Sequence, residues 1–186
     1  CLLGPTGVGK TAFVSSLYER FPDRFEIISV DSVAVYRGMD IGSAKPSPEE
    51  RALMSYHLLD ICDPKETYSA ARFVADACSA IDGIHQRGKV AVLVGGTMLY
   101  YHALLVGLSP MPTICADARR KTQEVLALGL SSAYKALQEY DPVLAARLSP
   151  QDSQRIQRGL EVFYASDIPL CDWQKKPRLP GLSTCK

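Results

Sequence analysis

The sequence predicts an α/β fold, in which helices cover both faces of a parallel sheet and a helical appendage follows the sheet. Three observations lead to this prediction. Apolar runs alternate with helical patterns over residues 1–108, which favours parallel strands joined by helices. A glycine-rich loop directly precedes the first helical pattern. Beyond residue 109, two prolines interrupt the chain and only helical patterns follow.

The glycine-rich loop has the spacing G-x-x-x-x-G-K-[ST], which is typical of a phosphate-binding loop, or P-loop. Its glycines let consecutive backbone N–H groups turn toward an anion. Lys10 adds a positive charge at the terminal phosphate, and the Thr11 hydroxyl is a Mg²⁺ ligand in such loops. We therefore predict a P-loop NTPase-like, three-layer α/β/α core. The residues expected to bind a diphosphate or triphosphate are Gly4, Pro5, Thr6, Gly7, Val8, Gly9, Lys10 and Thr11.

The remaining elements of the predicted core follow in order. Leu2 and Leu3 are interpreted as the end of a first strand that the start of the chain cuts short. Further strands are predicted at 26–30, 57–61 and 89–94, because these runs are short and apolar. Helices are predicted at 11–20, from the capping box at Ser47, at 69–87 and at 98–106. His57, alone beside an apolar run, is interpreted as structural.

Two side chains follow strands of the predicted sheet. Asp31 follows the strand 26–30, at the edge where open α/β sheets bind ligands. It is either a general base or a Mg²⁺-organising carboxylate, and a helix cap is the structural alternative. Thr97 comes after Gly95 and Gly96, where a helix cap and a ligand contact remain equally open. Because the strand 89–94 ends in glycine where hydrolysing ATPases usually carry an aspartate, a motor or switch ATPase is disfavoured.

The domain prediction has three parts: a core at 1–108, a helical region at 109–167, and a loose tail at 168–186 that is rich in proline and lysine. The helical region contains clustered basic residues. They form either a solvated helix face or a nucleic-acid-binding surface, and the pattern leaves both open. These residues are Arg119, Arg120, Lys121, Arg147, Arg155 and Arg158.

The composition is that of an ordinary globular protein, with 47% hydrophobic and 22% charged residues. A net charge of +1 gives no general support for nucleic-acid binding, so such a partner would need a local patch. The six cysteines are scattered and contain no C-x-x-C pair, which favours a reducing, cytoplasmic location, with an organelle as the alternative. Because no apolar run is long enough to cross a bilayer, we expect no membrane partner. For the oligomeric state, we expect a monomer by default.

Several stretches together resemble the tRNA dimethylallyltransferase family, also called tRNA isopentenyltransferases. They occur in family order over nearly the whole chain, and the two longest of the first five, at 28–47 and 94–112, are long enough to be highly specific. The stretches are GPTGVGKT (4–11), ISVDSVAVYRGMDIGSAKPS (28–47), HLLDICDP (57–64), YSAARF (68–73), VGGTMLYYHALLVGLSPMP (94–112) and DPVLAARLSPQDSQRIQRGLEVF (141–163).

The resemblance implies a function. The P-loop would hold dimethylallyl diphosphate, with Mg²⁺ at Thr11, and the acceptor would be the exocyclic amine of the adenine just after the anticodon in tRNA. Asp31 would be the general base that takes a proton from this amine. The residues implied to contact tRNA are Asp31, Ser32, Val33 and Ala34 around the flipped adenine, Thr97 near the substrates, and Gln154, Arg155, Ile156, Gln157 and Arg158 at the anticodon loop.

The family pattern extends beyond this chain. Its members continue downstream with an arginine-containing motif that has no match here, so we expect a fragment that lacks the carboxyl-terminal part and is inactive or much weakened by itself. Three alternatives remain: a P-loop nucleotide or metabolite kinase that uses ATP, an adenylate isopentenyltransferase, and a relic that binds diphosphate or RNA without turnover. The basic helical region argues against the second, because a free nucleotide needs no such arm.

Overall fold

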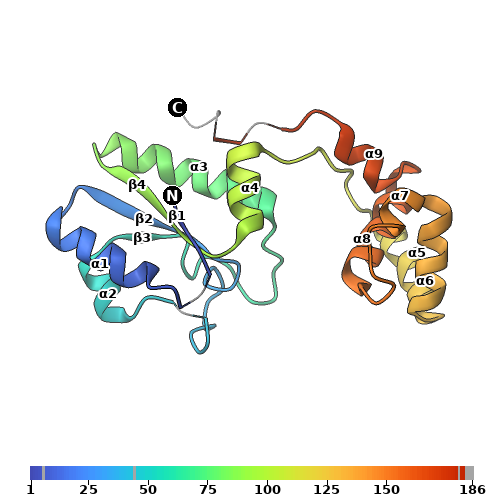
Figure 1. The fold of residues 1–186 in the computed structure, drawn as a ribbon, viewed down its shortest axis with the longest axis horizontal. Helices are drawn as coiled ribbons and strands as arrows, with labels where there is room; N and C mark the ends of the chain where they lie inside the picture. The colour runs from blue at the N-terminus through green and yellow to red at the C-terminus, as the bar shows by residue number, and fades with distance from the viewer. Residues whose placement is uncertain (6, 44, 180, 183–186) are drawn as a thin grey trace. The chain divides into compact units, whose positions relative to one another are not determined.

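The computed structural model describes residues 1–5, 7–43, 45–179 and 181–182. The chain divides into two compact units, of which the first contains Cys1–Leu108 and the second is Ser109–Leu179. Within the described residues, the first unit has a four-stranded parallel sheet, which confirms the predicted α/β fold (Figure 1). Its strand order is β1 (Leu2–Leu3), β4 (Val90–Gly95), β2 (Phe25–Val30) and β3 (Tyr56–His57).

The two central strands, β2 and β4, pair along their whole length, from Phe25 opposite Val90 to Val30 opposite Gly95. Both strands therefore end at the same edge of the sheet. At this edge a Cβ atom on Gly95 would lie 2.1 Å from the Val30 carbonyl oxygen, so the close approach of the two strands requires glycine. The segments that follow β2 and β4 consequently lie next to each other.

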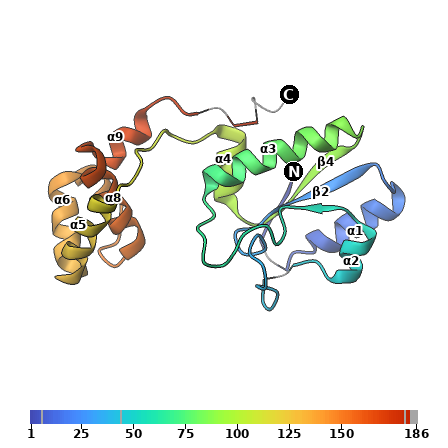
Figure 2. The same cartoon turned by 180° about the vertical axis from the view of Figure 1, so that it is seen from behind.

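Helices cover both faces of the sheet (Figures 1 and 2). On one face, α3 (Ala70–Gln86) and α4 (Met98–Val106) bury a cluster that includes Ile28, Val30, Phe73, Leu93 and Tyr101. On the other face, α1 (Lys10–Arg20) and α2 (Pro48–Leu53) cover a smaller cluster of Val14, Phe25, Ile27 and Met54. Because β2 side chains alternate, Ile27 and Asp31 share the face that α1 covers.

Local sequence explains where two of these helices begin. Ser47 and Glu50 form the predicted capping box of α2, in which the Ser47 hydroxyl accepts from the Glu50 N–H and the Glu50 carboxylate accepts from the Ser47 N–H. Ser69 caps α3 by accepting a hydrogen bond from the Arg72 N–H.

The third strand is shorter than predicted. We expected a strand over residues 57–61, but β3 ends at His57 because Leu58 and Asp60 have positive φ angles of 62° and 55°. The chain then pairs with the segment after β2 instead. The Asp60 N–H donates to the Ala34 carbonyl at 3.2 Å, and the Cys62 N–H donates to the Val35 carbonyl at 3.0 Å.

The second unit is helical in the part of the chain that the structure describes. Its core contains the fully buried Leu137, Ile156 and Leu160. Its helices are α5 (Ala116–Ala127), α6 (Leu130–Tyr140), α7 (Pro142–Ala145), α8 (Ser153–Ser166) and α9 (Leu170–Lys175). No described helix in either unit is long and apolar enough to cross a membrane.

The prediction of a loose tail from residue 168 is wrong at α9. This short helix belongs to the second unit, and its first residues, Leu170 and Cys171, are buried. The fully buried Asp141 explains the attachment, because its carboxylate accepts hydrogen bonds from the N–H groups of both Leu144 and Cys171 at 2.9 Å. Residues 180 and 183–186 of the predicted tail lie outside the described residues.

Candidate functional site

The P-loop connects β1 to α1. Gly7 and Gly9 have φ angles of 85° and 88°, a left-handed conformation that favours glycine. Gly9 is the N-cap of α1, and no side chain accepts a hydrogen bond there. The first-turn N–H groups of α1 thus remain available to an anion at the positive end of the helix. Thr6, which we also predicted to bind phosphate, lies outside the described residues.

The Lys10 ammonium folds back over this loop. It donates to the Gly4 carbonyl at 2.8 Å and to the Pro5 carbonyl at 2.7 Å. No carboxylate among the described residues forms an ion pair with it. Because carbonyl dipoles compensate only part of a full positive charge, Lys10 still favours an anion in the loop.

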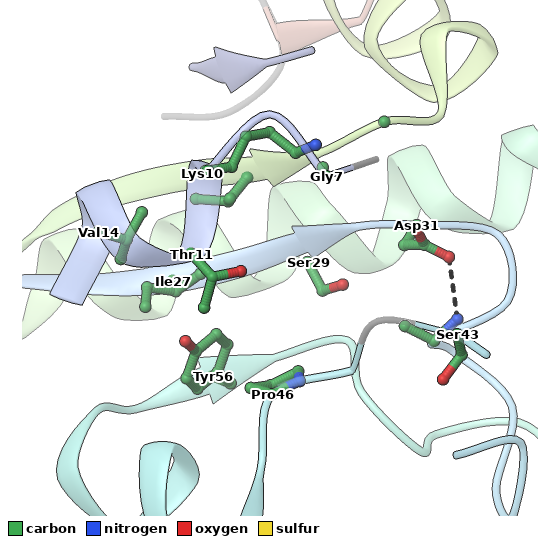
Figure 3. Close-up of a pocket in the computed structure, with 15 residues that line it drawn as sticks. Gly7, Lys10, Thr11, Val14, Ile27, Ser29, Asp31, Ser43, Pro46 and Tyr56 are labelled. Carbon is green, nitrogen blue, oxygen red and sulfur yellow. Dashed lines mark hydrogen bonds between the residues drawn. The ribbon is translucent and has the colours of Figure 1, made fainter. Parts of the chain in front are cut away.

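A pocket of about 380 Å³ lies beside the loop (Figure 3). The P-loop contributes Gly7, Gly9, Lys10 and Thr11 to its lining, and Asp31 lines the same pocket. The remaining lining is mixed, with apolar side chains on α1, β2 and β4. These apolar residues are Val14, Ile27 and Val94.

The Asp31 carboxylate is fixed by the turn that follows β2. Its Oδ1 atom accepts the N–H of Val33 at 2.8 Å and the N–H of Ala34 at 3.1 Å, and the second bond is the dashed line in Figure 3. Asp31 therefore stabilises a turn, and the alternative of a helix cap is excluded because no helix begins here. In the described part of the chain, no hydrogen bond to Oδ2 is present, so this oxygen is the one open to a ligand.

Thr97 lies against the same turn. Its Oγ1 accepts the backbone N–H of Ser32 at 3.0 Å and makes no capping hydrogen bond to α4. Thr97 is thus the N-cap residue of α4 by position, as one of the two predicted roles has it, but its side chain does not cap the helix. It also lies at the edge where β2 and β4 end. Ser32 and Val33 are exposed there, whereas Ala34 is buried and lines the pocket.

The stretch from Gln154 to Arg158 lies in the second unit, on α8. Gln154, Arg155 and Arg158 are exposed, but Ile156 is fully buried in the core and has no side-chain surface to offer a ligand. Arg155 pairs with Asp152, and Arg158 lies 3.8 Å from Glu161, so acidic neighbours partly compensate these charges. Gln154, Arg155 and Arg158 therefore form the exposed face of this stretch, and Gln157 is partly exposed beside them.

Several pocket residues were not predicted. Ser29 lies two residues before Asp31 on the same face of β2, so strand alternation could have indicated it. The glycine-punctuated stretch 33–45 indicates a loop over the ligand edge, and Ser43 reaches the pocket from this loop. Pro46 and Tyr56 reach the pocket from segments that no local pattern indicates. Burial raises the pKa of Tyr56 to about 12, so its phenol is neutral.

The donor set of the pocket suits a hard divalent cation. The Thr11 hydroxyl is exposed, and it and the Asp31 carboxylate are oxygen donors in one pocket. Among the described residues, no three His, Cys, Asp or Glu side chains gather as a metal-binding group. A cation here would therefore share its coordination with phosphate oxygens and water.

Three of the known proteins that are similar to this chain are each named as a dimethylallyltransferase. A tRNA dimethylallyltransferase from Halorhodospira halophila is 52% identical over 184 residues, which are 98% of this chain and 59% of that protein. One from Paraburkholderia xenovorans is 55% identical over 88% of this chain and 51% of its own length. A crystal structure of a eukaryotic dimethylallyltransferase acting on tRNA matches with a TM-score of 0.75 at 30% identity, over 97% of this chain and 45% of that one.

The chain thus spans about half the length of the curated relatives that it matches. The family model for IPP transferase matches residues 34–185, which include the pocket residues Ala34, Ser43 and Pro46 and the whole helical unit. On this match and these identities, the chain belongs to the IPP transferase family.

Proposed function

We propose that this chain forms the reaction core of an enzyme that transfers a dimethylallyl group to tRNA. The donor is dimethylallyl diphosphate, and the acceptor is the exocyclic amine of the adenine 3′-adjacent to the anticodon. One observation carries the proposal: Asp31 and the P-loop residues Gly7, Gly9, Lys10 and Thr11 line a single pocket. A binding site for the leaving diphosphate and a base for the incoming amine are thereby present in the same pocket.

In this reaction the amine nitrogen forms a bond to C1 of the donor, and the bond from C1 to the diphosphate oxygen breaks. Oδ2 of Asp31 accepts the proton that the amine loses, while Oδ1 stays bonded to the Val33 and Ala34 N–H groups. The α1 first-turn N–H groups and Lys10 stabilise the charge that develops on the diphosphate.

Mg²⁺ is the proposed cofactor, and the Thr11 hydroxyl is its protein ligand. When bound, the cation neutralises charge on the leaving diphosphate. On the tRNA side, Ser32, Val33 and Thr97 surround the entry of the adenine, which must leave the base stack to react. The exposed Gln154, Arg155 and Arg158 contact the anticodon loop, where single-stranded bases are accessible.

The test is mass spectrometry of a tRNA anticodon stem-loop incubated with Mg²⁺, dimethylallyl diphosphate and the full-length protein of which we expect this chain to be a part. We expect the mass of one dimethylallyl group on the adenine after the anticodon. A parallel thermal-unfolding series compares dimethylallyl diphosphate with ATP, each with Mg²⁺. Stabilisation by ATP alone, together with an unmodified stem-loop, would identify a nucleotide-using P-loop protein and refute the proposal.

A further inference from the structure

Lys45 is a buried cation that the proposed reaction does not use. Its side chain is 3% exposed, and its ammonium donates three hydrogen bonds. The acceptors are the Tyr36 carbonyl at 2.6 Å, Asp40 Oδ1 at 2.9 Å and Asp60 Oδ1 at 2.7 Å. All three N–H donors of the ammonium are therefore used within the first unit, and none is left for a ligand.

Asp60 provides a rigid anchor for Lys45. Its backbone has a φ of 55°, and its N–H is bonded to the Ala34 carbonyl in the turn after β2. Two residues on, Cys62 pairs with Val35 and accepts the Arg37 N–H at 3.0 Å. The Lys45 ammonium thus ties the loop between β2 and α2 to the segment around Asp60, which backbone hydrogen bonds hold in place.

A second cation binds the same carboxylate. Arg51, on α2, donates to Asp60 Oδ2 at 2.6 Å and to the carbonyl of Pro46 at 3.1 Å. Burial alone would raise the pKa of Asp60, but its hydrogen bonds with Lys45 and Arg51 outweigh this effect and lower it. Asp60 is consequently an ionised link between two cations that flank Pro46.

The residues beside Lys45 form one wall of the pocket. Ser43 and Pro46 line it, and Figure 3 shows them across the pocket from Lys10 and Gly7. Ser43 is 8% exposed and donates to the Asp40 carbonyl at 3.0 Å, so it is held by the same loop that Lys45 ties down. Loss of the Lys45 bonds would free this wall without touching the P-loop.

We infer that Lys45 is a positioning residue that fixes the pocket wall of Ser43 and Pro46 against the part of the donor that is not diphosphate. The inference rests on the proposed function for the identity of the donor. It makes a selective prediction: the wall contributes to binding of the dimethylallyl group, whereas the P-loop alone binds the diphosphate.

The experiment compares the native protein with Lys45→Met, which removes the three hydrogen bonds at similar side-chain volume. Hydrogen–deuterium exchange without substrates is followed at peptides that contain Ser43 and Pro46, and we expect faster exchange in the variant. With saturating anticodon stem-loop, we expect the KM for dimethylallyl diphosphate to rise about tenfold, while the inhibition constant of inorganic pyrophosphate changes less than about threefold. Lys45→Arg, which keeps the charge, should recover much of the native KM.

Lys89→Met is the matched control. Lys89 also pairs with two carboxylates, Asp23 at 3.9 Å and Glu26 at 3.4 Å, but it does not line the pocket, so both constants should stay native. Unchanged exchange in the peptides that contain Ser43 and Pro46 in Lys45→Met overturns the inference whatever the reaction is. Equal changes in both constants also overturn it. If the Lys45→Met variant exchanges faster but the native protein does not prenylate the stem-loop, Lys45 still fixes the wall of Ser43 and Pro46. That result would refute only the proposed function.

Discussion

Thr97 Oγ1 accepts the backbone N–H of Ser32 at 3.0 Å, although the two residues lie 65 positions apart in sequence. This bond ties the end of β4 to the turn that follows β2. The neighbouring Asp31 carboxylate binds the same turn through the Val33 and Ala34 N–H groups. The position of the proposed base therefore depends on a hydroxyl from another strand.

Replacing Thr97 by valine should lower kcat about tenfold, because valine has the same shape but cannot accept the Ser32 N–H and the turn loses its fixed position. The KM for dimethylallyl diphosphate should stay near the native value, since the P-loop is untouched. Steady-state kinetics with a tRNA stem-loop measure both. Thr97→Ser retains the hydroxyl and should behave like the native protein. A raised KM for the stem-loop with native kcat would instead show a direct substrate contact.

Asp31→Asn should lower kcat by about 10²- to 10⁴-fold, the usual contribution of a general base. The amide oxygen can still accept the Val33 and Ala34 N–H groups, so the turn should persist and the inhibition constant of pyrophosphate should change little. Single-turnover prenylation gives the rate. Asp23→Asn, at a carboxylate that is 82% exposed and outside the pocket, serves as the control. A native rate in Asp31→Asn would remove the base from the mechanism.

The positions of the P-loop and Asp31 in one pocket follow from local sequence signals. Glycine spacing determines the loop, and a strand followed by a carboxylate places Asp31 at the ligand edge. Pro46 and Tyr56 reach the pocket through long-range packing, which no short pattern encodes. The end of β3 depends on the left-handed backbone at Leu58, a residue type that rarely adopts it, so the apolar run 57–61 was misinterpreted as one strand.

The helix α9 was missed for a related reason. Its composition is that of a loose segment, but its first turn is bonded to Asp141, 30 positions earlier. Asp141→Ala should leave the buried N–H groups of Leu144 and Cys171 without acceptors and cost about 2–4 kcal/mol of unfolding free energy. Hydrogen–deuterium exchange should also accelerate at Leu170–Lys175. Urea unfolding and exchange measure these effects.

Asp152→Ala provides a comparison for Asp141. Asp152 also caps a helix, accepting the Arg155 N–H at 3.2 Å, but it is more exposed. Its loss should cost only about 1 kcal/mol and leave exchange in α9 native. Equal costs for the two variants would contradict the proposed role of Asp141 in holding α9.

Glu26 should make the stability of the first unit depend on pH. The hydrogen bonds from Arg87 lower its pKa from 4.5 to about 2, with His57 and Lys89 adding to the effect and burial opposing it. A carboxyl group with a lower pKa in the folded state stabilises the fold above its unfolded pKa. This contribution, about 3 kcal/mol, should be lost as the pH falls from 4.5 toward about 2.

Urea unfolding of the native protein and Glu26→Gln, from neutral pH down through the range between 4.5 and about 2, isolates the Glu26 contribution from that of other carboxylates. At neutral pH the native protein should be the more stable, and the difference should shrink as the pH falls. A difference that stays constant with pH would show that the ion pairs of Glu26 do not contribute to stability.

Gly95→Ala should destabilise the first unit by about 3 kcal/mol or more, because the added Cβ would lie 2.1 Å from the Val30 carbonyl oxygen where β2 and β4 are closest. Gly96→Ala is the matched control, since its Cβ would meet only the Gly4 carbonyl oxygen, at 3.4 Å, and should cost less than about 1 kcal/mol. Urea unfolding of both variants tests the contrast. Similar stabilities would mean that the strand edge beside Asp31 can widen, and the fixed distance between the proposed base and the P-loop would then lose its structural basis.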